Sequence, residues 1–314
     1  MLYPIVTYIR SHQISPPDLI PKDQFNRPEI ILRYIKYQIV EAMDHLPKDE
    51  SAVRGDNAGT ELADSKAPEV SQSGLIDTTE AVSSLVDALC HRPNNPPSLY
   101  IDLEGVDLSR IGTISILQVY LLPTNETYLV DVRCLGSAAF TTSGVTNKEM
   151  TLQSILQSDQ IIKAFFDVRN DSDALYSHYG IDLAGICDIQ LMELATRSGR
   201  KKMGNGLARC IERDAPFTWQ ERQEWGAVKE AGKKLFAPER GGSYEVFNHR
   251  PMSQEMIIYC KKDVQILPRL WQTYSAKMSS TWAAKVEAAT KDRVKLSQSA
   301  TFVGQGRHMA LGPW

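Results

Sequence analysis

The stretch SLYIDLE at residues 98–104 combines an apolar strand pattern with two carboxylates. Successive side chains of a strand point to opposite faces, so Tyr100, Asp102 and Glu104 share one face and the intervening leucines and isoleucine take the other. An isolated pair of acids of this kind most often belongs to a solvated edge strand, because charged side chains are usually exposed. Here the opposite face is strongly apolar, which favours a strand inside a sheet.

The segments that follow alternate between strand-like and helix-like patterns. Strand-like runs occupy residues 114–122, 127–132 and 161–168, and the first two are separated by a turn-rich join typical of an antiparallel meander. Helix-like patterns occupy residues 78–90, 152–157, 171–179, 189–197, 206–213, 219–235 and 253–278. Pro268 should kink or divide the last of these helices. The alternation predicts an α/β domain in which helices pack on a mixed sheet.

A second acidic feature lies in the run FFDVRNDSDAL at residues 165–175, where an apolar strand ends in polar residues that open a helix. Asp171 lies where this helix is expected to begin, so it is either a functional carboxylate or a helix cap, a role that Asn170 could also fill. Asp167 and Asp173 are competing carboxylates in the same run. The residues alone leave these readings open.

A third feature is the run YCKKD at residues 259–263, inside the last predicted helix. A separation of four residues places Tyr259 and Asp263 side by side on one helical face. Such pairs are common on half-buried helices, so this run by itself is weak evidence for a functional site.

In this order along the chain, the three features resemble the three exonuclease motifs of the DEDD superfamily, in the subgroup whose third motif uses tyrosine. The nearest resemblance is to the ribonuclease D-like 3′-5′ exonuclease domain, over residues 74–283. This resemblance implies a ribonuclease H-like α/β fold, with a mixed sheet and helices on both of its faces. Two features depart from the family pattern: Phe166 stands where many relatives have a polar residue, and residues 219–245 look like an insertion that could line the substrate groove.

The resemblance also implies roles for five residues. Asp102, Glu104, Asp171 and Asp263 match the four metal-binding acids, and Tyr259 matches the tyrosine that positions the attacking water. Two Mg²⁺ or Mn²⁺ ions, roughly 3.5–4 Å apart, stabilise the attacking and leaving oxygens of such a displacement, and these hard cations prefer oxygen ligands. We expect Asp102 to bridge the ions, with Glu104 and Asp263 on the hydrolytic metal. Tyrosine titrates near pH 10, so we expect Tyr259 to orient a metal-bound water and not to act as a base.

The implied function is a two-metal 3′-5′ exonuclease that acts on the 3′ end of single-stranded nucleic acid, with RNA a better candidate than DNA. The alternative is a catalytically silent scaffold that keeps the fold to bind RNA or a partner. A silent relative would typically have lost one or more of the acids, whereas all five positions are filled here, which favours the enzyme. A structural α/β domain with coincidental acids ranks below both.

Basic residues that could hold the nucleic acid lie outside the three motifs. Arg200, Lys201 and Lys202 form a basic run between glycines, and Arg240 lies in a turn-rich segment. Lysine and arginine that neutralise phosphates give an affinity that weakens with salt. An equally good interpretation is that these residues lie in solvent-exposed loops and bind no nucleic acid.

The remaining segments have simpler readings. Residues 1–47 predict an N-terminal extension with an amphipathic helix, residues 48–73 an acidic disordered linker, and residues 284–314 a C-terminal tail. The linker region from residue 48 to residue 69 carries six acids against three bases, which accounts for the whole net charge of −3, so the net charge excludes no class of partner.

The five cysteines are scattered singly and predict free thiols. The chain lacks an apolar run of roughly 18 residues and a secretory signal, so we expect a soluble intracellular protein without a membrane partner.

Overall fold

The computed structural model describes residues 74–314 of the chain. The predicted N-terminal extension (1–47) with its amphipathic helix and the predicted linker (48–73) lie outside the described residues. Across the described range, no helix combines the length and the apolar character that crossing a membrane requires.

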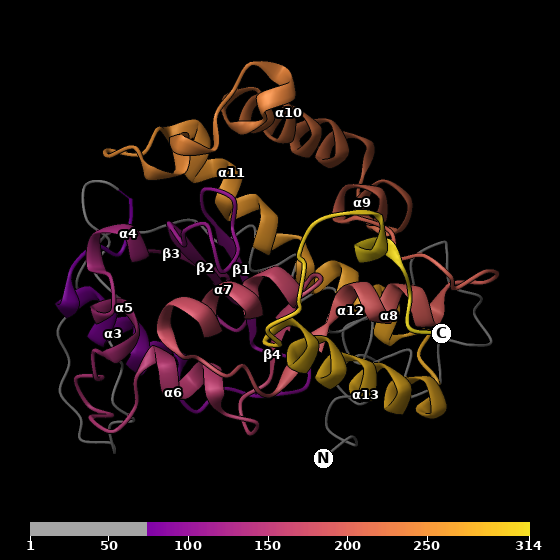
Figure 1. Ribbon diagram of the computed structural model, residues 1–314, viewed down its shortest axis with the longest axis horizontal. Helices are drawn as coiled ribbons and strands as arrows, with labels where there is room; N and C mark the ends of the chain where they lie inside the picture. Colours follow the sequence, from indigo (N-terminus) through magenta and orange to yellow (C-terminus); the bar gives the residue numbers. More distant parts are fainter. Residues whose placement is uncertain (1–73) are drawn as a thin grey trace, which may run out of the picture. The chain divides into compact units, whose positions relative to one another are not determined.

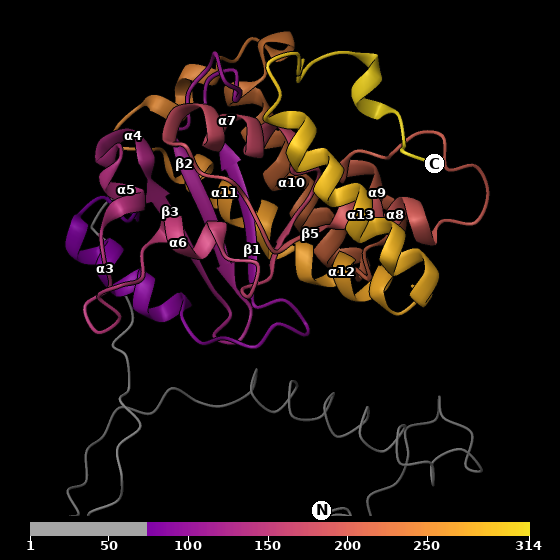
Figure 2. The same ribbon diagram turned by 60° about the horizontal axis from the view of Figure 1, so that its bottom comes forward.

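A mixed sheet forms the centre of the domain, in the strand order β3-β2-β1-β4-β5 (Figures 1 and 2). Strands β1 (Leu99–Glu104), β2 (Ile116–Leu121) and β3 (Glu126–Asp131) pair antiparallel as a meander. Strands β4 (Lys163–Phe165) and β5 (Ile186–Asp188) extend the other side of β1 in parallel. The central position of β1 confirms the prediction that the acid-bearing strand lies inside the sheet.

Helices cover both faces of this sheet. One face packs on α3 (Thr79–Leu89), α6 (Leu152–Gln157) and α7 (Arg169–Tyr179). The opposite face packs on α8 (Ile189–Thr196), α11 (Gln254–Gln265) and α12 (Leu267–Ser275). The other helical segments are α4 (Val132–Leu135), α5 (Ala138–Thr141), α9 (Leu207–Asp214), α10 (Trp219–Phe236), α13 (Ser280–Ser297), η1 (Pro238–Arg240), η2 (Tyr244–Asn248) and η3 (Arg307–Ala310). The predicted α/β layering with helices on both faces is confirmed.

The alternation along β1 separates two apolar clusters. Leu99, Ile101 and Leu103 belong to the cluster beneath α3, α6 and α7, whereas Tyr100 belongs to the cluster beneath α8 and α12. Side chains of a strand alternate between faces, so the acids that follow Tyr100 at every second residue share its face. The pattern read from the sequence therefore determines which side of the sheet carries the acids.

Of two expectations about helix ends, the structure contradicts the one for Asp171 and confirms the one for Pro268. Helix α7 begins at Arg169 after Val168, whose side chain makes no capping hydrogen bond, so Asp171 lies in the first turn and the cap reading was wrong. Pro268 divides the last predicted helix: α11 ends at Gln265, and the proline occupies the first turn of α12. Proline is tolerated in a first turn because the missing N–H has no partner there in any helix.

Helix α13 crosses the domain limit that the sequence predicted at residue 283. It packs against α7, α8 and β5, and its Val286, Ala289 and Val294 are buried in the two main apolar clusters. The segment expected as a C-terminal tail therefore contains most of a helix that completes the core.

Candidate active site

Three carboxylates from two elements converge in one cavity. Asp102 and Glu104 project from β1, and Asp263 projects from α11, which packs across β1, β2 and β3. Each residue offers a carboxylate oxygen that lies within 4.8 Å of those of the other two. All three line a cavity of about 340 Å³. The predicted first and third motifs therefore meet in space.

Asp171, the acid of the predicted second motif, is buried next to this trio. It is not among the three residues whose oxygens meet the 4.8 Å distance. Burial and then the charge of Asp102 raise its pKa well above the usual range, and its own charge contributes to raising the pKa of Glu104. Its Oδ1 is buried without a hydrogen-bond partner among the described residues. Asp171 is thus close enough to act on the cluster and has an oxygen to offer.

The electrostatics of the cluster favour a bound cation. Burial first, and then the negative charge of Asp263, raise the pKa of Asp102 to about 7. The pKa of Glu104 is raised well above its ordinary value by burial, then by Asp102 and Asp263. Carboxylates that are close together and partly desolvated resist ionisation unless a positive charge lies between them. A set made only of carboxylate oxygens, including the unpartnered one of Asp171, fits hard divalent cations such as Mg²⁺ or Mn²⁺.

Tyr259 lines the same cavity one helical turn before Asp263. Its side chain is buried, and burial followed by the charge of Asp263 raises its pKa above the ordinary value of tyrosine. The hydroxyl therefore stays protonated at neutral pH and can donate a hydrogen bond, but it cannot act as a base. This agrees with the orienting role expected from the sequence.

Lys229 is the residue that the sequence reasoning missed. It lies on α10, inside the segment predicted as an insertion, and its ammonium forms an ion pair with Oδ1 of Asp263. The same Nζ is 3.8 Å from the centroid of the Tyr259 ring. Lys233, one turn later, also lines the cavity, as does Phe166. The only sequence signal was the suggestion that residues 219–245 line the groove.

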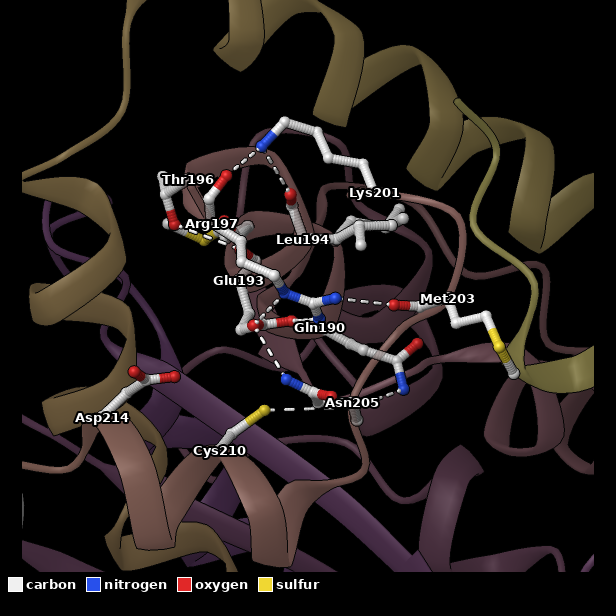
Figure 3. A network of polar contacts seen from close by, with 12 residues as sticks. Gln190, Glu193, Leu194, Thr196, Arg197, Lys201, Met203, Asn205, Cys210 and Asp214 are labelled. Atoms are coloured by element: carbon white, nitrogen blue, oxygen red, sulfur yellow. Dashed lines mark hydrogen bonds and ion pairs between the residues drawn. The ribbon is translucent and has the colours of Figure 1, made fainter. Parts of the chain in front are cut away.

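The basic run at residues 200–202 sits on a loop held by a buried polar network (Figure 3). Arg197 donates to Glu193 through Nε at 2.8 Å, and Asn205 donates to the same carboxylate at 3.1 Å. Lys201 points inward, because its Nζ donates to the carbonyl of Leu194 at 3.1 Å and to that of Arg197. The network therefore fixes both ends of the loop.

The four predicted nucleic-acid-binding residues lie apart from the cavity lining. Arg200 and Lys202 are exposed on the loop, whereas Lys201 is engaged as an anchor. Arg240 forms an ion pair with Glu230 on the surface. Their role in binding nucleic acid remains a prediction.

Comparison with known proteins decides the family. A family model described as 3′-5′ exonuclease matches residues 79–278. The chain belongs to this 3′-5′ exonuclease family. The matched range contains all five predicted site residues, and members of the family depend on divalent metal.

Solved structures show which fold the exonuclease domain has. A structure of Trypanosoma brucei RNase D with RNA U12 has a TM-score of 0.57 at 21% identity, over 74% of this chain and 72% of that one. A second structure of the same organism's RNase D has a TM-score of 0.57 at 24% identity, over 74% of each chain. The ribonuclease H-like fold expected from the resemblance is confirmed.

Two curated relatives match a shorter stretch of the exonuclease chain. The mouse piRNA biogenesis protein EXD1 is 34% identical over 113 residues, which is 36% of this chain and 18% of that protein. The human protein of the same name is 35% identical over 114 residues, 36% of this chain and 20% of that protein. The match thus spans about a fifth of the length of these relatives.

Proposed function

We propose that this protein is a two-metal-ion exonuclease that hydrolyses phosphodiester bonds from the 3′ end of single-stranded nucleic acid, and that RNA is its substrate. The observation that carries the proposal is the convergence of Asp102, Glu104 and Asp263, whose oxygens lie within 4.8 Å of one another in a cavity that Tyr259 also lines. These are the residue types, in the chain order, that a metal-dependent exonuclease of this family requires.

The proposed metal ligands are Asp102, Glu104, Asp171 and Asp263, which together would hold two Mg²⁺ or Mn²⁺ ions. When bound, such ions supply Lewis acidity and lower the pKa of bound water. The chain itself contributes the clustered carboxylates, which a divalent ion would relieve of their mutual repulsion. Burial first, and then the charge of Asp263, raise the pKa of Asp102 to about 7, and a bound divalent ion would favour the ionised form against both effects.

The remaining cavity residues have roles that follow from their chemistry. The protonated hydroxyl of Tyr259 donates a hydrogen bond that orients the attacking water. Phe166 offers an apolar surface to the terminal base, and Lys233, which is partly exposed, offers a positive charge to a phosphate. A volume of about 340 Å³ is at the lower end of ligand pockets, which favours a single chain end over a duplex.

Two kinds of similar protein support RNA over DNA. The T. brucei RNase D structure contains RNA U12, and the mouse and human relatives are named for piRNA biogenesis. Arg200, Lys202 and Arg240 are proposed to hold more distant phosphates through sequence-independent, salt-sensitive contacts. Lys201 joins them in the proposal, with its ammonium also anchoring the loop.

One observation favours a second candidate function, a catalytically silent scaffold that binds RNA or a partner. The ammonium of Lys229 already lies against Asp263 and supplies positive charge to the cluster without any metal. A site neutralised in this way could keep its fold and bind RNA without hydrolysing it.

The deciding experiment uses the full chain with single-stranded RNA and DNA labelled at the 5′ end, in Mn²⁺, Mg²⁺ or chelator. We expect a ladder of products shortened from the 3′ end on RNA, lost with chelator and absent for Asp102→Ala. Binding of RNA without shortening in any metal would reject the enzyme and support the scaffold. Unchanged degradation by Asp102→Ala would reject the assignment of the site.

A further inference from the structure

Both close partners of the Lys229 ammonium are candidate active-site residues. The side chain of Lys229 is 9% exposed, and its Nζ forms an ion pair with Asp263, which is 4% exposed. The same Nζ lies 3.8 Å from the centroid of the Tyr259 ring, a distance at which the ring face attracts a cation. A lysine rarely lies this deep without a specific partner. The ion pair with Asp263 and the contact with the Tyr259 ring therefore fix the position of the Lys229 ammonium in the site.

Helix α10 is shaped to hold this lysine in place. Gly232 follows Lys229 by three residues and meets the Tyr259 ring so closely that a Cβ would lie 2.2 Å from ring atom Cδ2. Trp225 precedes Lys229 by four residues, and its ring centroid is 5.8 Å from Nζ. Residues three and four apart share one helical face, so these three residues present a single surface to α11. Figure 1 shows α10 beside α11 above the sheet.

The charge of Lys229 reaches the whole acid cluster. It opposes the rise in the pKa of Asp102 and of Glu104, which burial and the neighbouring carboxylates produce. An ammonium and a divalent cation repel each other strongly at contact distance in a site that is shielded from water. The two cannot occupy the same side of Asp263 at the same time.

We propose that Lys229 occupies the metal position beside Asp263 and must be displaced before a second divalent ion binds. This inference rests on the proposed function, because it assumes that the acids hold metal. Its consequence is unequal binding: the ion on the Asp102 side enters freely, whereas the ion on the Asp263 side competes with Lys229. The second ion therefore binds weakly, and Lys229 makes the site respond to the concentration of free metal.

The test is a titration of the full chain with Mn²⁺, in which electron paramagnetic resonance measures the free ion, without any substrate. The parent should bind one ion tightly and a second weakly. Lys229→Met should tighten the second ion by about tenfold or more, because the competing charge is gone. Lys234→Met is the control on the same helix, since Lys234 is exposed and does not line the cavity. The control should bind both ions as the parent does.

Further variants keep the proposal open to refutation. Lys229→Gln replaces Lys229→Met if the latter fails to fold, as judged by circular dichroism, and Lys229→Arg keeps the charge and should keep the weak second ion. Equal affinities in the parent and in the neutral variants would overturn the proposal, as would a tight second ion in Lys229→Arg. A parent that degrades RNA and binds two ions tightly would reject this inference alone. Absence of Mn²⁺ binding in the parent and in every variant would instead reject the metal site of the proposed function.

Discussion

Gly232 of α10 and Tyr259 of α11 are in direct contact, with no room between them for a side-chain carbon. A Cβ at residue 232 would lie 2.2 Å from Cδ2 and 2.7 Å from Cγ of the tyrosine ring. Glycine within a helix costs about 1 kcal/mol relative to alanine. Gly232 thus lowers the stability of α10 but allows the helix to approach the cavity closely. This close approach sets the position of the Tyr259 ring.

Gly232→Ala should therefore destabilise the protein and impair the site together. We expect a loss of about 1–3 kcal/mol in the free energy of unfolding, because the new methyl group overpacks the contact, and a lower rate of RNA degradation as Tyr259 shifts. Urea denaturation and the degradation assay measure the two effects. Gly226→Ala is the control in the same helix, since a Cβ there meets nothing within 4 Å. It should gain up to about 1 kcal/mol from helix propensity, and equal effects of the two substitutions would contradict the proposed contact.

Much of the fold follows from local patterns in the sequence. The strict alternation in β1 placed its acids on one face, and Pro268 marked the break between α11 and α12. Strand β5 was missed because three residues are too few for a periodic pattern. Helix α13 was missed because its buried positions, such as Val286 and Val294, are separated by polar residues that also pack.

The site was predictable only where residues close in sequence act together. Asp102 with Glu104, and Tyr259 with Asp263, each share a face through strand or helix geometry. Lys229 is 34 residues from Asp263 in the sequence and reaches it only because α10 docks on α11. No periodicity in the chain encodes such docking, so a residue of this kind emerges only from the tertiary structure.

Tyr259→Phe should separate metal binding from hydrolysis. The phenylalanine ring keeps the apolar contacts and the face presented to Lys229, whereas the donor hydroxyl is lost. We expect unchanged Mn²⁺ affinity and a fall in turnover of about a hundredfold, typical of the loss of one positioned donor. Titration with Mn²⁺ and single-turnover degradation of RNA measure the two properties. Turnover at the parent rate would remove the tyrosine from the mechanism.

Arg293 fixes α13 to the core, and its loss should be costly. The side chain is 8% exposed and donates to Asp188 at 2.7 Å and to Gln190 at 2.8 Å. Arg293→Met leaves the buried Asp188 carboxylate without this partner, so we expect a loss of about 3 kcal/mol in the free energy of unfolding. Lys291→Met on the same helix breaks an exposed pair with Glu287, which solvent screens, and should leave the free energy of unfolding close to that of the parent. Similar losses in both variants, measured by urea denaturation, would argue against the role of Arg293.

A chain that ends at residue 283, the limit predicted from the sequence, should not fold. It would lack most of α13 and expose the apolar surfaces of α7 and α8 that this helix covers. Circular dichroism and the cooperativity of thermal unfolding test this expectation against the full chain. A cooperative transition at the same temperature as that of the full chain would show that the domain ends at residue 283, as the sequence predicted.

Lys163 should make the stability of the protein rise with pH above neutrality. Its side chain is fully buried on β4, and its Nζ donates to the carbonyl of Ile155 at 2.9 Å and to that of Ser158 at 2.6 Å. Burial lowers the pKa of Lys163 from 10.5 to about 7, and the charge of Asp159 opposes this only in part. Between these two pKa values the folded protein has released the proton while the unfolded chain still holds it. Since stability rises with pH wherever the unfolded chain binds more protons, the native state gains stability as pH rises through about 7.

The substitution Lys163→Met isolates this contribution. The free energy of unfolding of the parent, minus that of the variant, should increase by about 2 kcal/mol between pH 7 and pH 9, at 1.36 kcal/mol per pH unit once the folded group has titrated. Urea denaturation at pH 6, 7, 8 and 9 gives this difference directly. Lys295→Met, at an exposed position of α13, controls for the loss of a lysine and should leave the pH profile parallel to that of the parent. If Lys163→Met also runs parallel to the parent, the buried lysine is charged throughout this range, and its two carbonyl acceptors stabilise the ammonium enough to offset burial.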